Sequence, residues 1–190
     1  MGVMIIVMGL PGAGKTTVLN GAVSGFADWK VLNYGDMMFE IAKREKIVNE
    51  RDEMRKLPLK SQKRIQDEAA KKLSEIQGKV ILDTHCSIQT ATGYMPGLPF
   101  DQLRKLKVDY LVFITAPAKD ILGRRQRDTT RKRDVVSIED VERDISVNIS
   151  YLCTYSVLSG AAASIITNAD GKLDDAVGRL KEVIKKAGEA

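Results

Sequence analysis

Short apolar runs recur along the chain, separated by longer stretches in which apolar residues repeat every three or four positions. The runs are mostly β-branched and apolar on both faces, which is typical of strands buried on both sides in a parallel sheet. The pattern predicts five strands, at Val3–Met8, Lys30–Tyr34, Lys79–Thr84, Asp109–Thr115 and Ala163–Asn168.

The stretches between these runs have helical periodicity. The longest opens with Ser137 and Asp140 at the spacing of a capping box and closes at Gly160, and both signals mark helix ends. Strands that alternate with helices predict an α/β fold, a doubly wound five-stranded parallel sheet flanked by helices on both faces. Further helices are predicted at Thr16–Phe26, Asp36–Lys46, Asn49–Leu57 and Ser61–Gln77, from Ala118 onward, and from about Leu173 to Lys186.

The composition fits a single compact domain over residues 1–190, because 44% of the residues are hydrophobic and 29% are charged. No apolar stretch approaches the roughly 20 residues that cross a bilayer. The opening "MGVMIIVMG" also lacks the basic region of a signal peptide, so we expect a cytoplasmic protein without membrane contact. Cys86 and Cys153 lie far apart and His85 is the single histidine, which argues against a disulfide framework or a zinc site.

The net charge of +5 is concentrated in one segment. Residues 118–133, "AKDILGRRQRDTTRKR", carry seven Lys or Arg and two Asp, while the remaining 23 basic and 23 acidic residues cancel. A concentrated basic segment on an otherwise neutral protein favours a polyphosphate pocket over an extended nucleic-acid-binding face. We therefore do not expect a nucleic-acid partner.

A glycine-rich corner follows the first predicted strand. It reads "GLPGAGKT" and matches the P-loop pattern GxxxxGK followed by Ser or Thr, between a buried strand and a helix. Its glycines let backbone N–H groups point inward, and the helix adds its positive N-terminal end. Lys15 is expected to reach the β- and γ-phosphates of ATP, and the Thr16 hydroxyl to ligate Mg²⁺. The alternative is a glycine-rich turn without a ligand. The candidate ATP-binding residues here are Gly9, Leu10, Pro11, Gly12, Ala13, Gly14, Lys15, Thr16 and Thr17.

A carboxylate ends the third predicted strand. Asp83 closes the run "VILD" at the sheet edge where open α/β folds bind ligands. Carboxylate oxygens suit Mg²⁺, so Asp83 is the candidate partner of the ion, directly or through water. The alternative is a buried, structural Asp.

Two arginines suit a second substrate that carries a phosphate. Arg51 and Arg55 lie four residues apart, on one face of the helix predicted from Asn49. The alternative for Arg51 is a surface pair with a neighbouring carboxylate, from Glu50, Asp52 or Glu53. Fewer carboxylates surround Arg55.

At six segments the chain resembles the archaeal-type adenylate kinases, over nearly its full length and in the family's order. The segments are "GLPGAGKTT", "NYGDMMFEIAKRE", "RDEMRKLP", "LDTHCSIQTATGYMPGLP", "RRQRDTTRKRD" and "SIITNADGKLDDAV". The resemblance implies Mg²⁺-dependent transfer of the γ-phosphoryl group of ATP to AMP, giving two ADP. It also implies a core with the P-loop at 9–17, a nucleoside-monophosphate-binding region at about 34–77, a short lid at about 128–136, and a homo-oligomer, since archaeal members tend to form trimers.

The acceptor side departs from the commoner bacterial pattern. Phe39 follows the "GD" pair where bacterial enzymes carry an arginine, and His85 and Cys86 lie where their "DGFPR" stretch carries another. Arg55 is therefore the main candidate for holding the phosphate of AMP. The candidate AMP-binding residues are Gly35, Asp36, Arg51, Arg55 and His85.

Because the predicted lid is short, we expect the basic segment at 118–133 to supply its contacts with phosphate. Seven basic residues with two acids cannot all be paired locally, so Arg124, Arg131 and Arg133 are expected to close over the phosphates. The alternative for Arg124 is a surface pair with Asp120, four residues earlier, worth only about 0.3 to 0.5 kcal/mol. The resemblance further implies that the adenine of ATP lies between the lid's first arginine and the backbone from Asn168 to Gly171.

The chemistry of this transfer agrees with the residues present. The attacking phosphate oxygen of AMP is already deprotonated at pH 7, so no general base is needed. His85 and Cys86 are not expected to form a catalytic dyad, because adjacent side chains at a strand end point to opposite faces. Two alternatives stay open: a kinase for another small acceptor, and a P-loop ATPase or binding module with a role at the ribosome or on RNA.

Overall fold

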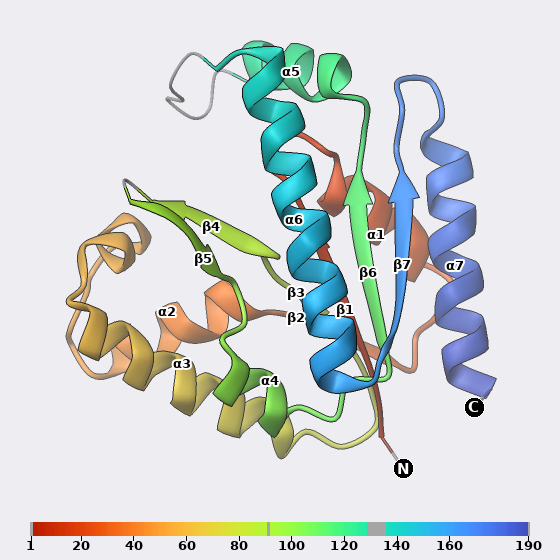
Figure 1. Cartoon of the computed structure of the whole chain (residues 1–190). Helices are drawn as coiled ribbons and strands as arrows, with labels where there is room; N and C mark the ends of the chain where they lie inside the picture. Colours follow the sequence, from red (N-terminus) through yellow and green to blue (C-terminus); the bar gives the residue numbers. More distant parts are fainter. Residues whose placement is uncertain (1, 91, 129–135, 190) are drawn as a thin grey trace.

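The computed structural model describes residues 2–90, 92–128 and 136–189, which form an α/β fold (Figure 1). Within the described part of the chain, none of the helices is both long and apolar enough to cross a membrane. In chain order the elements are β1 (Val3–Gly9), α1 (Lys15–Val23), β2 (Trp29–Asn33), α2 (Tyr34–Arg44), a 3₁₀ helix η1 (Arg51–Lys56), α3 (Leu59–Ser74), β3 (Lys79–Asp83), β4 (Ser87–Thr90), β5 (Gly93–Pro96), α4 (Phe100–Lys105), β6 (Tyr110–Thr115), α5 (Ala118–Arg127), α6 (Ile138–Ser159), β7 (Ala162–Thr167) and α7 (Leu173–Glu189).

The main sheet has five parallel strands in the order β2-β3-β1-β6-β7. From β1 the chain runs to the edge strand β2, returns to β3 beside β1, and then crosses to β6 and β7 on the other side. β1 therefore lies where the connections change side, which is where doubly wound sheets bind ligands. Two neighbours of β1 matter for the site: Val7 is the register partner of Asp83 in β3, and Gly9 is the partner of Ile114 in β6. The segments after these strands therefore meet at the carboxyl edge of the sheet.

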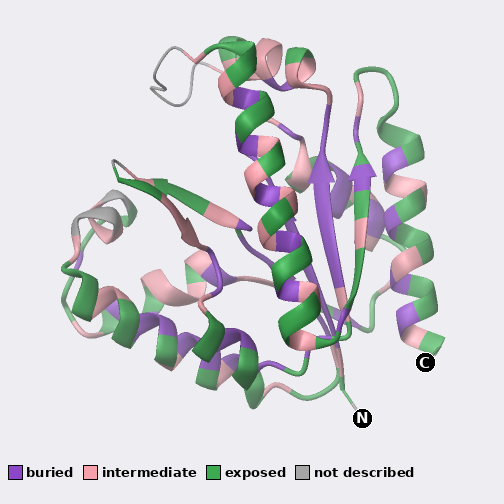
Figure 2. Ribbon diagram, in the orientation of Figure 1, coloured by how far each residue is buried: buried purple, intermediate pink, exposed green. Residues whose placement is uncertain are grey.

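Each face of the sheet has its own hydrophobic core (Figure 2). Ile5 and Val7 of β1 point into the core that α1 and α7 cover, while Ile6 and Met8 point into the core under α2, α3, α4 and α6. All four side chains are fully buried. This alternation confirms that the apolar runs are strands covered on both faces.

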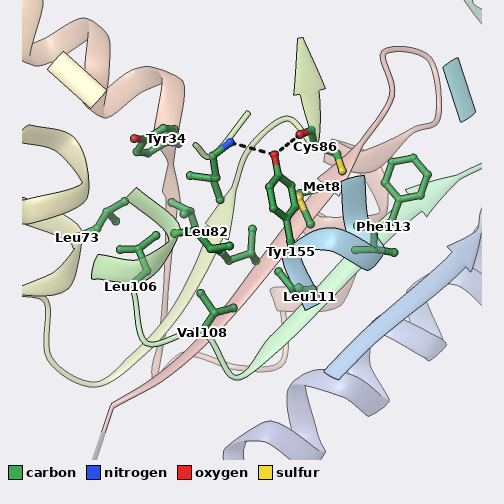
Figure 3. Close-up of a cluster of buried hydrophobic side chains, with 14 of the residues drawn as sticks. Met8, Tyr34, Leu73, Leu82, Cys86, Leu106, Val108, Leu111, Phe113 and Tyr155 are labelled. Atoms are coloured by element: carbon green, nitrogen blue, oxygen red, sulfur yellow. Dashed lines mark hydrogen bonds between the residues drawn. The ribbon is translucent and has the colours of Figure 1, made fainter. Parts of the chain in front are cut away.

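The larger core also holds polar atoms that are satisfied inside it (Figure 3). The Tyr155 hydroxyl donates to the Cys86 carbonyl oxygen at 2.7 Å and accepts from the Leu98 backbone N–H at 3.3 Å. Burial raises the pKa of this phenol above its usual range. The two bonds connect α6 to the segments on either side of the β4–β5 hairpin and fix the hairpin against α6.

The five predicted strands are confirmed to within one or two residues at each end. The capping box of Ser137 and Asp140 is present, and the same helix ends at Gly160 in the left-handed conformation, with φ 74°. The predicted helix at Asn49–Leu57 is instead the six-residue 3₁₀ helix η1.

The antiparallel hairpin of β4 and β5 and the short helix α4 were not predicted. The hairpin strands have four residues each, and Ile88 is exposed although it is apolar. Neither strand belongs to the main sheet, so neither carries the buried pattern that reveals the other five.

Candidate nucleotide site

The P-loop follows β1 and leads into α1, as predicted. Gly14 is the N-cap of α1 and has φ 81°, and a Cβ there would lie 2.4 Å from Nδ2 of Asn168. Gly9 has a different constraint, because its Cβ would lie 2.6 Å from the carbonyl oxygen of Ile114. No other residue type fits either position without movement of the backbone, so the loop's shape depends on glycine.

Lys15 and Asp83 form an ion pair in this structure. Each side chain is 13% exposed, and burial lowers the pKa of Lys15 to about 8. Asp83 Oδ1 accepts from Lys15, and Oδ2 accepts from Asn33 Nδ2 at 2.9 Å. Asp83 thus lies at the carboxyl end of β3 beside the P-loop lysine, and both its oxygens have protein partners, as the structural alternative requires. Its role toward Mg²⁺ stays a prediction.

Two residues hold the outer side of the P-loop. Asn168 Nδ2 donates to the Ala13 carbonyl oxygen at 2.9 Å, and Arg125 Nε donates to the Pro11 carbonyl oxygen at 2.8 Å. These bonds hold two carbonyl oxygens of the loop, and the Ala13 N–H donates within the loop to the Leu10 carbonyl oxygen at 3.1 Å. The arrangement is that of a preformed anion site at a helix N-terminus.

Arg124 adds further contacts to this outer layer. Its guanidinium donates to the carbonyl oxygens of Ala13 and Asn168, at 3.2 Å and 2.9 Å. It also pairs with Asp170. The alternative pairing with Asp120 is not what the structure has, because Asp120 accepts from the backbone N–H of Asp170 at 2.9 Å. Arg124 therefore connects α5, the P-loop and the segment after β7.

A pocket of about 230 Å³ opens beside these contacts. It lies at the turn after β7, where the family resemblance implies that adenine binds. The predicted residue Asn168 is 5% exposed and forms part of the wall. The lining residues are Gly14, Thr17, Arg124, Asn168, Ala169, Asp170, Gly171 and Leu173.

A second cavity of about 460 Å³ lies between the β4–β5 hairpin and the start of α6. Its wall includes Arg143, and also Asp144, which accepts from the Tyr94 hydroxyl at 2.5 Å and lies 3.8 Å from Arg125. Sequence reasoning missed Arg143 and Arg125 as parts of a site. Arg143 lies three residues after Asp140, a spacing that looks like an ordinary surface pair, and only the unpredicted hairpin turns this face into a cavity wall.

The acceptor-side candidates are only partly brought together. Gly35 and Asp36 lie in the first turn of α2, and Arg51 pairs with Asp36. A Cβ at Gly35 would lie 3.0 Å from Nη2 of Arg51. His85 is exposed and is the second residue after β3.

Three candidates are not located by their side chains. Arg55 lies in η1 by its backbone, and nothing is described of its side chain. Arg131 and Arg133 fall outside the described residues. Their roles therefore stay predictions.

A nucleophilic dyad of His85 and Cys86 does not exist in this site. Cys86 is fully buried, and its thiol donates to the Asn148 carbonyl oxygen at 3.2 Å. Burial raises the pKa of the thiol to about 12, so no thiolate forms near neutral pH. The position serves core packing.

The donors near the P-loop suit a hard cation. Thr16 offers a hydroxyl and Asp83 a carboxylate, which are oxygen ligands that Mg²⁺ prefers. Among the described residues, no group of three or more His, Cys, Asp or Glu side chains is placed to hold a metal. That arrangement fits an ion whose remaining ligands are phosphate oxygens and water.

Comparison with known proteins gives two kinds of similarity. A family model described as an AAA domain matches residues 8–142. The adenylate kinase of Methanocaldococcus jannaschii is 44% identical over 96% of this chain and 98% of its own length, and that of Pyrococcus abyssi is 41% identical over 98% and 97%. Among solved structures, shikimate kinase from Bacteroides thetaiotaomicron covers 96% of this chain and 98% of its own, with a TM-score of 0.61. At 15% identity this last likeness shows the fold alone.

Proposed function

This chain belongs to the adenylate kinase family, whose members are phosphotransferases, and we propose that it transfers the γ-phosphoryl group of ATP reversibly to AMP, giving two ADP. The observation that carries the proposal is the glycine-dependent cradle after β1, with Lys15 facing Asp83 at the carboxyl edge of the sheet. Phosphoryl transfer needs alignment and stabilisation of charge, and the attacking phosphate oxygen needs no base. The P-loop, with Lys15, can both align the phosphates and stabilise their charge.

On the donor side, the backbone N–H groups of residues 9–17, except Pro11, which has none, bind the phosphates of ATP. Lys15 exchanges Asp83 for the β- and γ-phosphates when ATP enters, because the phosphates bring more negative charge than one carboxylate. Burial makes this exchange effective, since a lysine with little water around it gains more from a phosphate partner than an exposed lysine does.

Mg²⁺ is the cofactor that we propose for this site. Thr16 would hold it through the hydroxyl, and Asp83 would hold it directly or through a water. When bound, the ion neutralises charge on the β- and γ-phosphate oxygens. The protein thus contributes two oxygen ligands beside the P-loop, the Thr16 hydroxyl and the Asp83 carboxylate.

The adenine of ATP occupies the pocket beside Asn168 and Arg124 in this proposal. The backbone groups at 168–171 offer donors and acceptors to a base, and the guanidinium of Arg124, which lines the same pocket, exchanges its present partners for phosphate oxygens. Arg131 and Arg133 close over the transferring group from the lid at about 128–136.

AMP binds to the region at about 34–77. Gly35 and Asp36 lie at the N-terminus of α2, where backbone N–H groups attract an anion. Arg55 holds the phosphate, and Arg51 leaves the exposed Asp36 carboxylate to join it. His85 borders the same edge of the sheet as the second residue after β3.

We further propose a cytoplasmic homo-oligomer, with a trimer as the form typical of archaeal relatives. Three large apolar side chains near the α6–β7 connection favour an interface there: Val157 is 84% exposed, and Leu158 and Ile165 are nearly half exposed. Light scattering during size-exclusion chromatography measures the state directly.

The test of the activity is its dependence on an acceptor. The protein is incubated with Mg²⁺ and ATP, alone and with each nucleoside monophosphate, while ADP and inorganic phosphate are followed. We expect ADP with AMP and almost none without it. Phosphate release without an acceptor would instead indicate an ATPase, and a strong preference for another monophosphate would indicate a kinase with a different acceptor.

A further inference from the structure

We propose that Asn33 is a positioning residue that couples the donor and acceptor sides of the site, because one side chain holds both Asp83 and the first turn of α2. The inference rests on the proposed function, which gives these two neighbours to different substrates. It assigns to Asn33 a role that no motif in the sequence indicates.

Asn33 is the last residue of β2 and the register partner of Asp83, the last residue of β3. Register partners in parallel strands place their side chains on the same face of the sheet. Two polar side chains thus stand next to each other at the carboxyl edge, directly beside the P-loop. The sheet itself sets their separation.

The amide of Asn33 uses its two ends in opposite directions. Nδ2 donates to Asp83 Oδ2 at 2.9 Å, and Oδ1 accepts from the backbone N–H of Asp36 at 3.0 Å. The orientation is chemically fixed, because a backbone N–H needs an acceptor and a carboxylate needs a donor. Asn33 is therefore both the N-cap of α2 and a ligand of the Asp83 carboxylate.

We call these two hydrogen bonds, which join Asp83 to Asp36 through Asn33, the Asn33 bridge. The bridge has its largest effect on Asp83 when Lys15 leaves that carboxylate. Without Lys15, Oδ1 of Asp83 becomes available to a cation or its water, while Oδ2 stays bound to Asn33. The carboxylate therefore keeps its plane during the exchange. Donors that orient a metal-binding carboxylate typically change metal affinity or activity by 10–100-fold when they are removed.

The other end of the bridge reaches the acceptor side. Asn33 Oδ1 fixes the first turn of α2, and it lies 3.2 Å from where a Cβ of Gly35 would be. A shift of α2 upon AMP binding would move this oxygen, and the rigid amide would pass the shift to Asp83. The geometry thus connects an element that binds AMP to the carboxylate that serves Mg²⁺.

Two substitutions separate the bridge from the helix cap. Serine and aspartate cap helices about as well as asparagine, so Asn33→Ser and Asn33→Asp keep α2. Serine is too short to reach Asp83, and aspartate places a second carboxylate against it. Asn20→Ser, an exposed position on α1, is the matched control.

The first measurement is kinetic. We expect Asn33→Ser to lower kcat about tenfold while each KM changes less than threefold, and Asn33→Asp to lower kcat at least as much. Both variants should melt within a few degrees of the wild type. Wild-type kcat in Asn33→Ser, with the fold intact, would show that Asn33 is only a cap and would overturn the proposal.

The second measurement does not depend on turnover. The backbone amide signal of Asp36 is followed by NMR while a non-hydrolysable ATP analogue is added with Mg²⁺. We expect the signal to shift in the wild type and in Asn20→Ser, and to stay in place in Asn33→Ser. An equal shift in Asn33→Ser would contradict the bridge. A wild type that makes no ADP from ATP and AMP would refute the proposed function, whereas this spectrum would still decide the role of Asn33.

Discussion

The donor and acceptor sides of this site are built in different ways. On the donor side, Lys15 and Asp83 are nearly buried, and the P-loop is held by Arg124, Arg125 and Asn168. Among the proposed AMP-binding residues on the acceptor side, Arg51 pairs with Asp36, and both side chains are more than half exposed. The donor side is thus preformed, whereas the acceptor side has contacts that a ligand can exchange at low cost.

This difference suits a kinase that must exclude water. A phosphate cradle that is rigid before ATP arrives costs little reorganisation during the reaction. Acceptor contacts that are weak and exposed allow AMP to enter and the region to close around it. Substitutions on the two sides should consequently have different signatures.

The largest effect is expected for Lys15→Ala. The change removes a charge directed at the transferring group, so phosphoryl transfer should fall by on the order of 10²-fold or more. Circular dichroism should show a native fold, and Lys181→Ala on the exposed face of α7 is the matched control. Unchanged turnover in a folded Lys15→Ala protein would contradict the proposal that the P-loop binds the transferring phosphates.

Arg55→Ala tests the acceptor side. Loss of a charged, forked contact to phosphate should raise the KM for AMP by about 10- to 100-fold, while the KM for ATP changes little. Initial rates with each substrate varied in turn give both constants. A parallel rise in the two KM values would indicate that Arg55 has a structural role or serves the ATP side instead.

A comparison of Arg124→Ala with Arg51→Ala tests whether contacts on the donor side stabilise the fold more than the exposed ion pair on the acceptor side. Arg124 donates to two backbone carbonyls and a carboxylate, so its loss should lower the free energy of unfolding by about 1 to 3 kcal/mol. Loss of the exposed Arg51 pair should cost less than about 1 kcal/mol. Urea unfolding monitored by circular dichroism measures both, and equal losses would contradict the contrast between the two sides.

The smallest effect concerns the thiols. Burial raises the pKa of Cys86 to about 12, so this thiol stays protonated and unreactive from pH 7 to 9 in the folded protein. A thiol reagent should modify the exposed Cys153 alone, without loss of activity. Rapid reaction of two thiols per chain in the native state would show that the core around Cys86 is open.

The parts that the sequence predicts well are local. Buried strands have a visible apolar pattern, and the P-loop is a contiguous motif between two such elements, so Lys15 and Asp83 could be placed at one edge in advance. The contacts that other segments make with the P-loop could not, since Arg124 meets the Ala13 carbonyl oxygen from 111 positions away. A distant pairing leaves no periodic signal in the chain.

Asn33 shows the same limit more sharply. Its identity before "YGD" suggests a helix cap, which is a local property. Its second contact, with Asp83, is 50 positions away and exists only because β2 and β3 are neighbours in register. Similarly, Arg143 forms part of a cavity wall only because the short β4–β5 hairpin, which has no buried pattern, lies opposite.

The central claim, that the cradle passes a phosphoryl group from ATP to AMP, is tested most directly by the fate of the γ-phosphorus. ATP labelled at that atom is incubated with the protein, Mg²⁺ and AMP, and the products are separated. We predict the label in the β-position of ADP, two ADP for each ATP consumed, and a rate lower by on the order of 10²-fold or more with Lys15→Ala. Label recovered as inorganic phosphate, at the same rate with and without AMP, would contradict this claim.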